Sequence, residues 1–235
     1  MNTQKISPII LHHYIRTAYR FFLLLLFSLY LLAKKGLGPQ LFLPLADHGR
    51  TVLSIIWLVF MCEMLLRHLP SKIESPGCQK IFKENYIPGK GNQIRIQDNN
   101  ALMLVAICWS VANLFFALLY NKGILGWDHM LLLSLLYSMG DMVCILVFCP
   151  FQKIFLKNKC CSHCRIYNWD YPFMFTPMLF AGGFFGWSLS FMAFTILLRW
   201  ELTFCLHPER FSADTNAYIG CKDCTEKICR HRLFP

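Results

Sequence analysis

The sequence predicts an all-α polytopic integral membrane protein, and three observations support this fold class. Of the 235 residues, 56% are hydrophobic, and the mean hydropathy is +0.43. Only 15% are charged, whereas an ordinary soluble domain carries about 25% charged residues. The charges gather between five apolar blocks, several of which approach the roughly 20 residues needed to cross a hydrocarbon core about 30 Å thick.

Each apolar block is expected to form one helical segment. Basic residues precede the first block, as in a secretory signal, but Ala33-Lys34-Lys35 offers no small-x-small cleavage site. We therefore expect a retained span. Pro150 is expected to stop the fourth block. Residues 1–206 would form a transmembrane helical domain, followed by a Cys-rich C-terminal tail over 207–235. The expected spans are 19–32, 51–66, 101–120, 130–149 and 173–198.

The fifth block contains the glycine-rich stretch Ala-Gly-Gly-Phe-Phe-Gly at 181–186, and two interpretations stay open. In the first, the glycines form a re-entrant turn or kink that returns the tail to its starting side. Such a turn needs protein to cover its backbone, and two full crossings would be tight at about 1.5 Å per residue. In the second, the block is one long tilted helix whose glycines pack against a neighbour.

Lys and Arg residues in the connections predict the orientation, because cytoplasmic loops carry an excess of both. If the tail returns to the side of the N-terminus, 19 of the 23 Lys and Arg residues lie on that side and 4 on the other. If the tail crosses instead, the distribution is 13 against 10. The bias predicts a multi-pass protein of the cell membrane with a cytoplasmic N-terminus and a cytoplasmic Cys-rich loop at 150–172. It mildly favours a cytoplasmic tail.

The basic loop at 67–100 carries six of these Lys and Arg residues. Such a loop suits contact with anionic lipid headgroups. An ordinary cytoplasmic loop would carry the same excess of Lys and Arg without any such contact. The net charge of +10 follows from the membrane topology. The lipid bilayer is therefore the expected partner, and no nucleic acid is expected.

Six of the twelve cysteines lie in two short polar stretches, 160–164 and 221–229, and each stretch contains a Cys-x₂-Cys. Two such turns brought together supply the four thiolates of a closed structural zinc site. An iron–sulfur cluster also needs four thiolates, although this spacing matches neither common ferredoxin pattern. The predicted ligands are Cys161, Cys164, Cys221 and Cys224, with Cys160, Cys229, His163 and His231 as further candidates.

The compartment decides what these thiols do. Neighbouring Lys and Arg residues favour the thiolate, which is the form that binds metal and attacks disulfides. A reducing cytosol disfavours persistent disulfides, so we expect zinc or an iron–sulfur cluster there, and disulfides or a thiol relay in an oxidising compartment. The two stretches form one site only if the fifth block brings the tail back.

Three polar side chains fall within the expected spans. Asp141 lies near the middle of the fourth span, where a carboxylate costs roughly 2.5–3.5 kcal/mol and marks an ion path or a buried pair. Asn113 in the third span is the expected hydrogen-bond partner of Asp141. Glu63 in the second span is expected to pair with Arg67, which follows one helical turn later.

Three functional hypotheses follow from these patterns. The first is a membrane protein whose Cys-ligated metal site joins the 160–164 loop to the tail, as a structural clamp or for electron transfer with a docked partner. The second is a transporter or sensor of a soft metal, with Asp141 on the path. The third is a membrane thiol–disulfide oxidoreductase. A soluble redox or metal-delivery protein is the expected protein partner. The sequence carries none of the common catalytic motifs, so enzymatic activity stays open.

Overall fold

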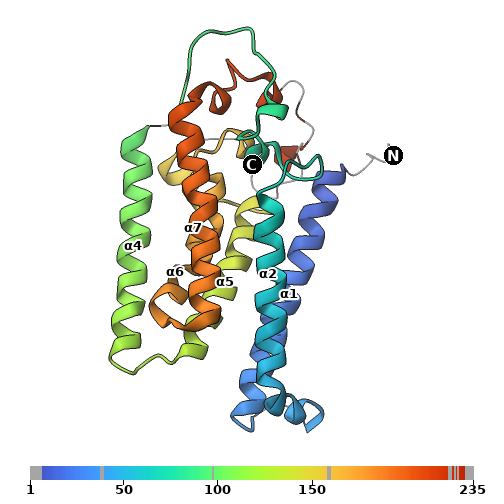
Figure 1. Ribbon diagram of the computed structural model, residues 1–235, viewed down its shortest axis with the longest axis vertical. Helices are drawn as coiled ribbons and strands as arrows, with labels where there is room; N and C mark the ends of the chain where they lie inside the picture. Colours follow the sequence, from blue (N-terminus) through green and yellow to red (C-terminus); the bar gives the residue numbers. More distant parts are fainter. Residues whose placement is uncertain are drawn as a thin grey trace.

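The computed structural model describes residues 7–37, 40–96, 98–157, 160–221, 224, 226 and 228–230. Within these residues the chain is a bundle of long helices with no β-strand, and one isolated bridge joins Pro88 to Asn216. Figure 1 shows the helices running side by side along the long axis, with both described ends of the chain near the top. The long helices are α1 (Pro8–Lys34), α2 (Gly49–Arg67), α4 (Asn99–Asn121), α5 (Trp127–Leu146), α6 (Asp170–Ala181) and α7 (Gly183–Leu206).

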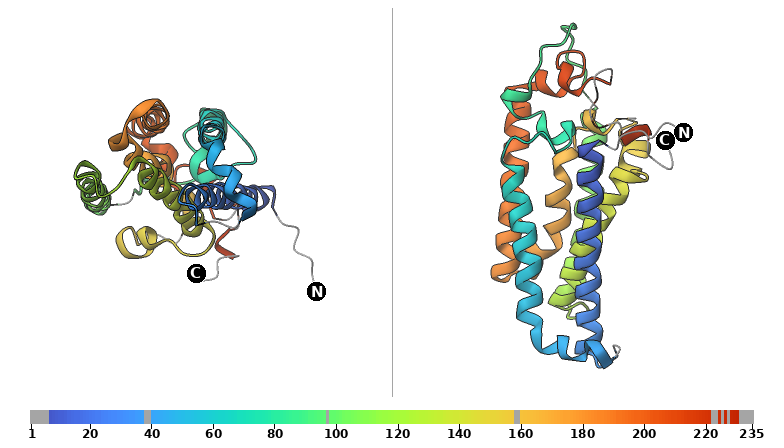
Figure 2. Two further views of the ribbon diagram at one scale, coloured as in Figure 1. Left: turned by 90° about the horizontal axis from the view of Figure 1, so that it is seen from below. Right: turned by 90° about the vertical axis from the view of Figure 1, so that its right-hand side faces the viewer.

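Five helices are long and apolar enough to cross a membrane: α1, α2, α4, α5 and α7. Their outward faces carry exposed Phe, Leu and Ile side chains, which suits contact with lipid. Buried apolar residues of α1, α2, α5, α6 and α7 form the main core. The prediction of an all-α polytopic membrane protein is confirmed. Seen from below in Figure 2, α4 stands at one edge of the bundle and α1 and α2 lie together on the other side.

The remaining elements are short turns of helix in the connections. Most are 3₁₀ helices, the short form of helix that is frequent in connections. They are η1 (Gln40–His48), α3 (Pro76–Gln79), η2 (Lys83–Asn85), the π-helical η3 (Phe151–Phe155), η4 (Cys161–His163), η5 (Tyr167–Trp169), η6 (Pro208–Phe211), η7 (Ala217–Ile219) and η8 (Ile228–Arg230).

Helix α1 begins well before the apolar block that predicted it. The Ser7 side chain accepts a hydrogen bond from the backbone amide of Ile9, and Pro8 occupies the first turn, where its missing N–H costs nothing. Consequently Arg16 and Arg20 lie inside the helix and not in the segment before it. Both arginines are buried, so the expected first span, 19–32, begins too late, and these two of the basic residues that precede or open it are not charges of an exposed N-terminal segment.

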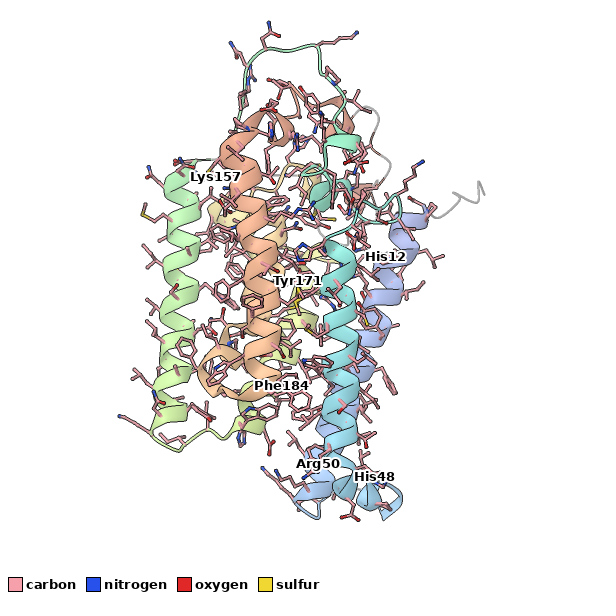
Figure 3. The ribbon with its side chains drawn as sticks, in the orientation of Figure 1. His12, His48, Arg50, Lys157, Tyr171 and Phe184 are labelled. Atoms are coloured by element: carbon pink, nitrogen blue, oxygen red, sulfur yellow. The ribbon has the colours of Figure 1, made fainter. Side chains whose placement is uncertain are left out.

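The fifth apolar block divides into two helices that reverse direction. Helix α6 has 12 residues and ends at Ala181, Gly182 makes the turn, and α7 then returns over 24 residues. In Figure 3, Phe184 at the start of α7 lies above His48 and Arg50, so the turn stops short of the lower end of the bundle. The re-entrant interpretation is therefore correct, and the single tilted helix is not observed.

Two backbone carbonyls of this reversal accept hydrogen bonds from neighbouring side chains, as an irregular backbone at membrane depth requires. The Tyr120 hydroxyl donates to the Ala181 carbonyl at 3.2 Å, and the Trp127 indole N–H donates to the Gly182 carbonyl at 3.3 Å. Gly182 has φ 72° and ψ −166°, a conformation open essentially to glycine alone. Gly186 lets the helices approach closely, because a Cβ there would lie 2.7 Å from the Met178 carbonyl oxygen.

The return of α7 brings the tail to the end of the bundle that holds the 68–98 and 147–169 connections. These three segments join into one polar cap at the top of Figure 1. The Gly89 amide donates to the Thr215 carbonyl at 2.8 Å, and the Ala217 amide donates to the Ile87 carbonyl at 2.8 Å. The Trp200 indole N–H donates to the Arg165 carbonyl at 2.8 Å. The cap is therefore built from segments distant in the sequence.

Lys80 lies at the centre of the cap and is fully buried. Its ammonium donates to the carbonyls of Ser162 and Cys164, each at 3.0 Å, and lies 5.1 Å from the ring centres of Trp200 and Phe211. Burial outweighs these contacts and lowers the pKa of Lys80 to about 7. The basic loop thus reaches inward to the Cys-rich loop through this side chain.

We predict that Gly182→Ala lowers the free energy of unfolding by about 1–3 kcal/mol, because an L side chain is strained at this positive φ. Thermal unfolding of the protein in detergent, followed by tryptophan fluorescence, measures the change. Gly140→Ala is the matched control, since its Cβ would meet no heavy atom within 4 Å on a regular helix. If the two variants were equally stable, the backbone conformation at Gly182 would not contribute to the stability of the fold.

Stability should also rise with pH through Lys80. Between pH 7 and about 10.5 the unfolded chain keeps the Lys80 proton and the folded chain does not, so raising the pH favours folding. Over that window we expect roughly 3–5 kcal/mol of stabilisation in the wild type that is missing from Lys80→Met. Lys83→Met, at an exposed lysine, should keep it. Parallel pH profiles for all three proteins would show that Lys80 stays protonated in the fold.

Candidate metal centre

The Cys-Cys-Ser-His-Cys segment at 160–164 folds into a short turn that divides its side chains between two environments. Cys161–His163 forms the 3₁₀ turn η4, and the Cys164 amide donates to the Cys161 carbonyl at 2.9 Å. Cys161 and Cys164 are buried, whereas Cys160 and His163 are only partly buried. The division follows from the tight turn, because successive side chains of a 3₁₀ helix point in different directions.

The partly buried side of this turn meets the C-terminal tail. The ligand atoms of Cys160, His163 and Cys221 all lie within 4.8 Å of one another. Two thiolates bound to one tetrahedral zinc ion stand about 3.8 Å apart, because each Zn–S bond is about 2.3 Å long. The three side chains are therefore close enough to share one ion after small rotations.

The tautomer of His163 is set by a hydrogen bond to the backbone. Its Nε2 lies 2.9 Å from the Ile219 carbonyl oxygen. Because a carbonyl only accepts, Nε2 carries the proton and Nδ1 keeps its lone pair. Backbone carbonyls commonly fix the tautomer of zinc-bound histidines in this way. Burial, with a contribution from Lys80, also lowers the pKa of His163, so the ring stays neutral and able to bind metal.

Two further thiols lie beside this group. Cys224 and Cys229 line a small hollow of about 10 Å³ together with Cys160 and Cys161. Burial and the nearby thiols of Cys160, Cys224 and Cys229 raise the pKa of Cys221. A bound cation would remove that repulsion, because it stabilises thiolates that otherwise disfavour one another. The donor set of thiols and one imidazole fits zinc.

Among the described residues, the four predicted thiols do not form one group of ligand atoms. Cys161 donates toward Gln152 at 3.8 Å, and Cys161 and Cys164 both line the buried pocket beside Gln152. Cys161 also lines the small hollow with Cys160, Cys224 and Cys229. The sequence does not show which pair of side chains faces the tail, because Cys160-x₂-His163 and Cys161-x₂-Cys164 overlap and have equal spacing. His231, a further candidate ligand, lies outside the described residues.

The polar residues of the spans form an ion-pair network. Arg20 donates to Glu63 at 2.7 Å, to Asp141 at 2.9 Å and to the Ser138 carbonyl at 3.1 Å. Arg16 reaches the same Glu63 carboxylate oxygen at 2.5 Å. The predicted Glu63–Arg67 pair is therefore wrong: helical spacing allows it, but two arginines from α1 occupy the carboxylate.

Asp141 and Asn113 are likewise not partners. Asp141 binds Arg20, and the Asn113 amide donates to the Trp109 carbonyl of its own helix at 2.9 Å. Arg67 instead lies 3.3 Å from Asp170 and 3.5 Å from Glu74. Sequence reasoning missed these arginine partners because it counted Arg20 with the cytoplasmic charges before the first span. If the first helix is extended to include Arg20 fully, this buried charge needs a carboxylate on another span. That need was the signal that could have revealed the network.

Comparisons with protein-family models, with curated proteins and with solved structures found no match in any of the three. The class of protein defined by the fold is a polytopic helical membrane protein with a candidate Cys/His metal centre in its polar cap.

We predict that Glu63→Gln destabilises the protein by about 3–5 kcal/mol, because it leaves Arg16 and Arg20 short of a buried negative charge. Chemical unfolding in detergent measures this loss. The control is Glu84→Gln at an exposed loop position, where we expect a change within about 0.5 kcal/mol. A similar small change for Glu63→Gln would mean that the arginines find other partners.

Proposed function

We propose that the protein is a membrane-embedded helical bundle whose polar cap is closed by a structural zinc ion. The observation that carries the proposal is the convergence of Cys160, His163 and Cys221 from the loop and the tail. Cys224 is the proposed fourth ligand, since it completes a Cys-x₂-Cys with Cys221 and lines the hollow beside Cys160. Three thiolates and one imidazole are a common ligand set of closed zinc sites.

The donor set favours zinc over an iron–sulfur cluster. A cluster usually needs four thiolates, whereas one of the three convergent groups here is the imidazole of His163. Cys161 and Cys164, which would have completed a four-thiolate set, line the buried pocket beside Gln152 and do not belong to the convergent group. Zinc needs no redox partner, and its tetrahedral site requires no open position in a structural role.

The proposed role is a clamp that holds the tail on the loop. Existing contacts point the same way: the two carboxylate oxygens of Glu226 meet the Ser162 hydroxyl at 3.0 Å and His13 Nε2 at 3.3 Å. These contacts tie the tail to both the loop and α1. A metal bridging the loop and tail would add a link whose formation is coupled to folding.

We infer that the cap faces the cytoplasm. Among the described residues, the Lys and Arg side chains at the opposite end are few, and cytoplasmic loops carry the excess. The reducing cytosol keeps thiols available for metal, and the exposed Cys221 gives a metal-delivery protein access to the site. The Lys and Arg residues of the opposite end are Lys34, Lys35, Arg50 and Lys122.

The other two hypotheses receive less support. Metal transport through Asp141 would need a carboxylate available to the ion, but Arg20 binds it at 2.9 Å. Thiol exchange between Cys161/Cys164 and Cys221/Cys224 would need both thiols of each pair in reach of the other, but Cys221 groups with Cys160 and His163, and Cys164 lines the buried pocket beside Gln152. We therefore favour the clamp.

Metal analysis of the full chain, purified in detergent, tests the proposal. We expect about one zinc per chain in the wild type, and loss of most of it in His163→Ala and Cys221→Ser because each removes a ligand. Cys161→Ser and Cys164→Ser should keep the zinc. Cys205→Ser, at an exposed cysteine of α7, is a further control for thiol loss. Proteolysis of the tail should accelerate when a chelator removes the metal.

Three outcomes would contradict the clamp. Retention of zinc by His163→Ala together with its loss from Cys161→Ser would restore the four-thiolate set. Bound iron with an absorption band near about 400 nm would indicate a cluster. A wild-type protein that binds no metal in the presence of excess zinc would remove the site altogether.

A further inference from the structure

An open cleft of about 380 Å³ lies where the polar cap meets the end of α2 and the last turns of α7. The two helices run side by side in Figures 1 and 2, and His68 Nε2 lies 3.2 Å from the Thr195 hydroxyl between them. The wall of the cleft combines residues of α7, of the 68–98 connection and of η6. None of these residues has a role in the candidate metal centre.

The lining of this cleft carries an excess of positive charge. Lys83, Arg199 and Arg210 contribute three positive charges. Glu84 is the only carboxylate among the described residues of the lining. Burial and the charge of Arg199 lower the pKa of His68, so its ring stays neutral. The lining therefore has a net charge of +2 at pH 7.

Most of the N–H donors of the two arginines are available to a ligand. Arg199 donates through Nη1 to the His68 carbonyl at 2.6 Å, and its guanidinium lies 4.7 Å from the centre of the Phe82 ring. Arg210 donates through Nη1 to the Ile81 carbonyl at 2.7 Å. Nε and Nη2 of both have no hydrogen-bond partner among the described residues, and none of these four atoms is enclosed by protein. Each arginine is thus held by one hydrogen bond and keeps further N–H groups for an oxoanion.

The neighbouring carboxylates do not neutralise this charge. Glu201 accepts a hydrogen bond from Arg165 at 2.8 Å, and Glu209 lies 3.1 Å from His207. Within the described part of the chain, none of the three cations of the cleft forms an ion pair. Arg210 is buried, and a buried charge without an opposite charge is costly. An anion bound in the cleft would therefore stabilise it.

The cleft lies where the surface of the bundle changes from apolar to polar. Because α2 and α7 are membrane-length helices, the exposed leucines at their ends face acyl chains, and the basic residues beside them lie at the level of the lipid headgroups. An anion at this level can therefore belong to a lipid. The leucines beside the cleft that are more than half exposed are Leu65, Leu66, Leu69, Leu198 and Leu202.

We propose that this cleft binds a lipid whose headgroup is a phosphate monoester, with its acyl chains lying along the exposed leucines of α2 and α7. A phosphate monoester carries about two negative charges at pH 7, which matches the net charge of the lining. Guanidinium groups bind phosphate oxygens through paired N–H donors, and basic pockets between membrane helices suit such headgroups. The proposal does not depend on the zinc clamp, since no proposed zinc ligand lines the cleft.

The test measures binding of radiolabelled dioctanoyl phosphatidic acid to the full chain in detergent micelles, with empty micelles correcting for partition. Dioctanoyl phosphatidylglycerol has the same chains but a phosphodiester with a single negative charge. Glycerol 3-phosphate has the phosphate monoester without the chains. We expect saturable binding of phosphatidic acid and weaker binding of phosphatidylglycerol. Glycerol 3-phosphate should compete only at concentrations well above that of the lipid.

Two exposed residues of the lining give variants with opposite expected effects. Lys83→Gln should weaken the binding of phosphatidic acid roughly two- to five-fold, and Glu84→Gln should strengthen it by a similar factor, because each changes one exposed charge. Lys90→Gln, at an exposed lysine of the same connection outside the cleft, is the matched control and should leave the affinity unchanged.

Arg199→Gln should weaken binding roughly ten-fold or more, since it removes charge-assisted hydrogen bonds. Thermal unfolding of this variant is measured alongside, because Arg199 also holds the His68 carbonyl. The Lys83 and Glu84 variants keep the test valid if Arg199→Gln does not fold.

Equal affinity for phosphatidic acid and phosphatidylglycerol would overturn the proposal, because the cleft would then not recognise a doubly charged headgroup. Identical affinities of the wild type, Lys83→Gln and Glu84→Gln would place the lipid elsewhere on the protein. Displacement of the lipid by an equal concentration of glycerol 3-phosphate would overturn the lipid assignment and indicate a site for a soluble phosphate ester.

Discussion

The pairing of Arg20 with Glu63 and Asp141 is the interaction on which the rest of the bundle depends. It joins α1 to α2 and α5 at a level where the arginine is completely buried. A buried guanidinium is tolerated only with opposite charges and hydrogen-bond acceptors around it, so the three helices must meet in one register. Arg16 shares Glu63, and Arg67 repeats the arrangement with Asp170 at the start of α6. The network thereby fixes where the re-entrant segment enters.

The reversal at Gly182 and Gly183 has consequences far from the glycines. It returns α7 to the side from which α6 entered and places the tail beside the 160–164 loop. The candidate metal centre is thus a result of a backbone turn at the opposite end of α7.

The sequence predicted the helices better than it predicted the contacts. Hydropathy and length identify five membrane-length segments, because burial in lipid acts on each segment separately. The partners of Glu63 and Asp141 were predicted wrongly, because spacing reports neighbours within one helix and not the face of another. The metal centre was partly foreseen: the two Cys-rich stretches do converge, but with Cys160 and His163 contributing from the loop. Overlapping motifs of equal spacing carry no information on which pair turns outward.

By itself the sequence determined that the chain is helical and membrane-embedded and that its thiols gather in two stretches. Composition and hydropathy suffice for these conclusions, since each depends on local residue content. Only the tertiary structure decided that the fifth block turns back, that the arginines of α1 neutralise carboxylates on α2 and α5, and that η4 divides its side chains between the tail and a buried cavity. These features depend on contacts between segments that are far apart in the sequence, and the packing of the whole fold decides those contacts.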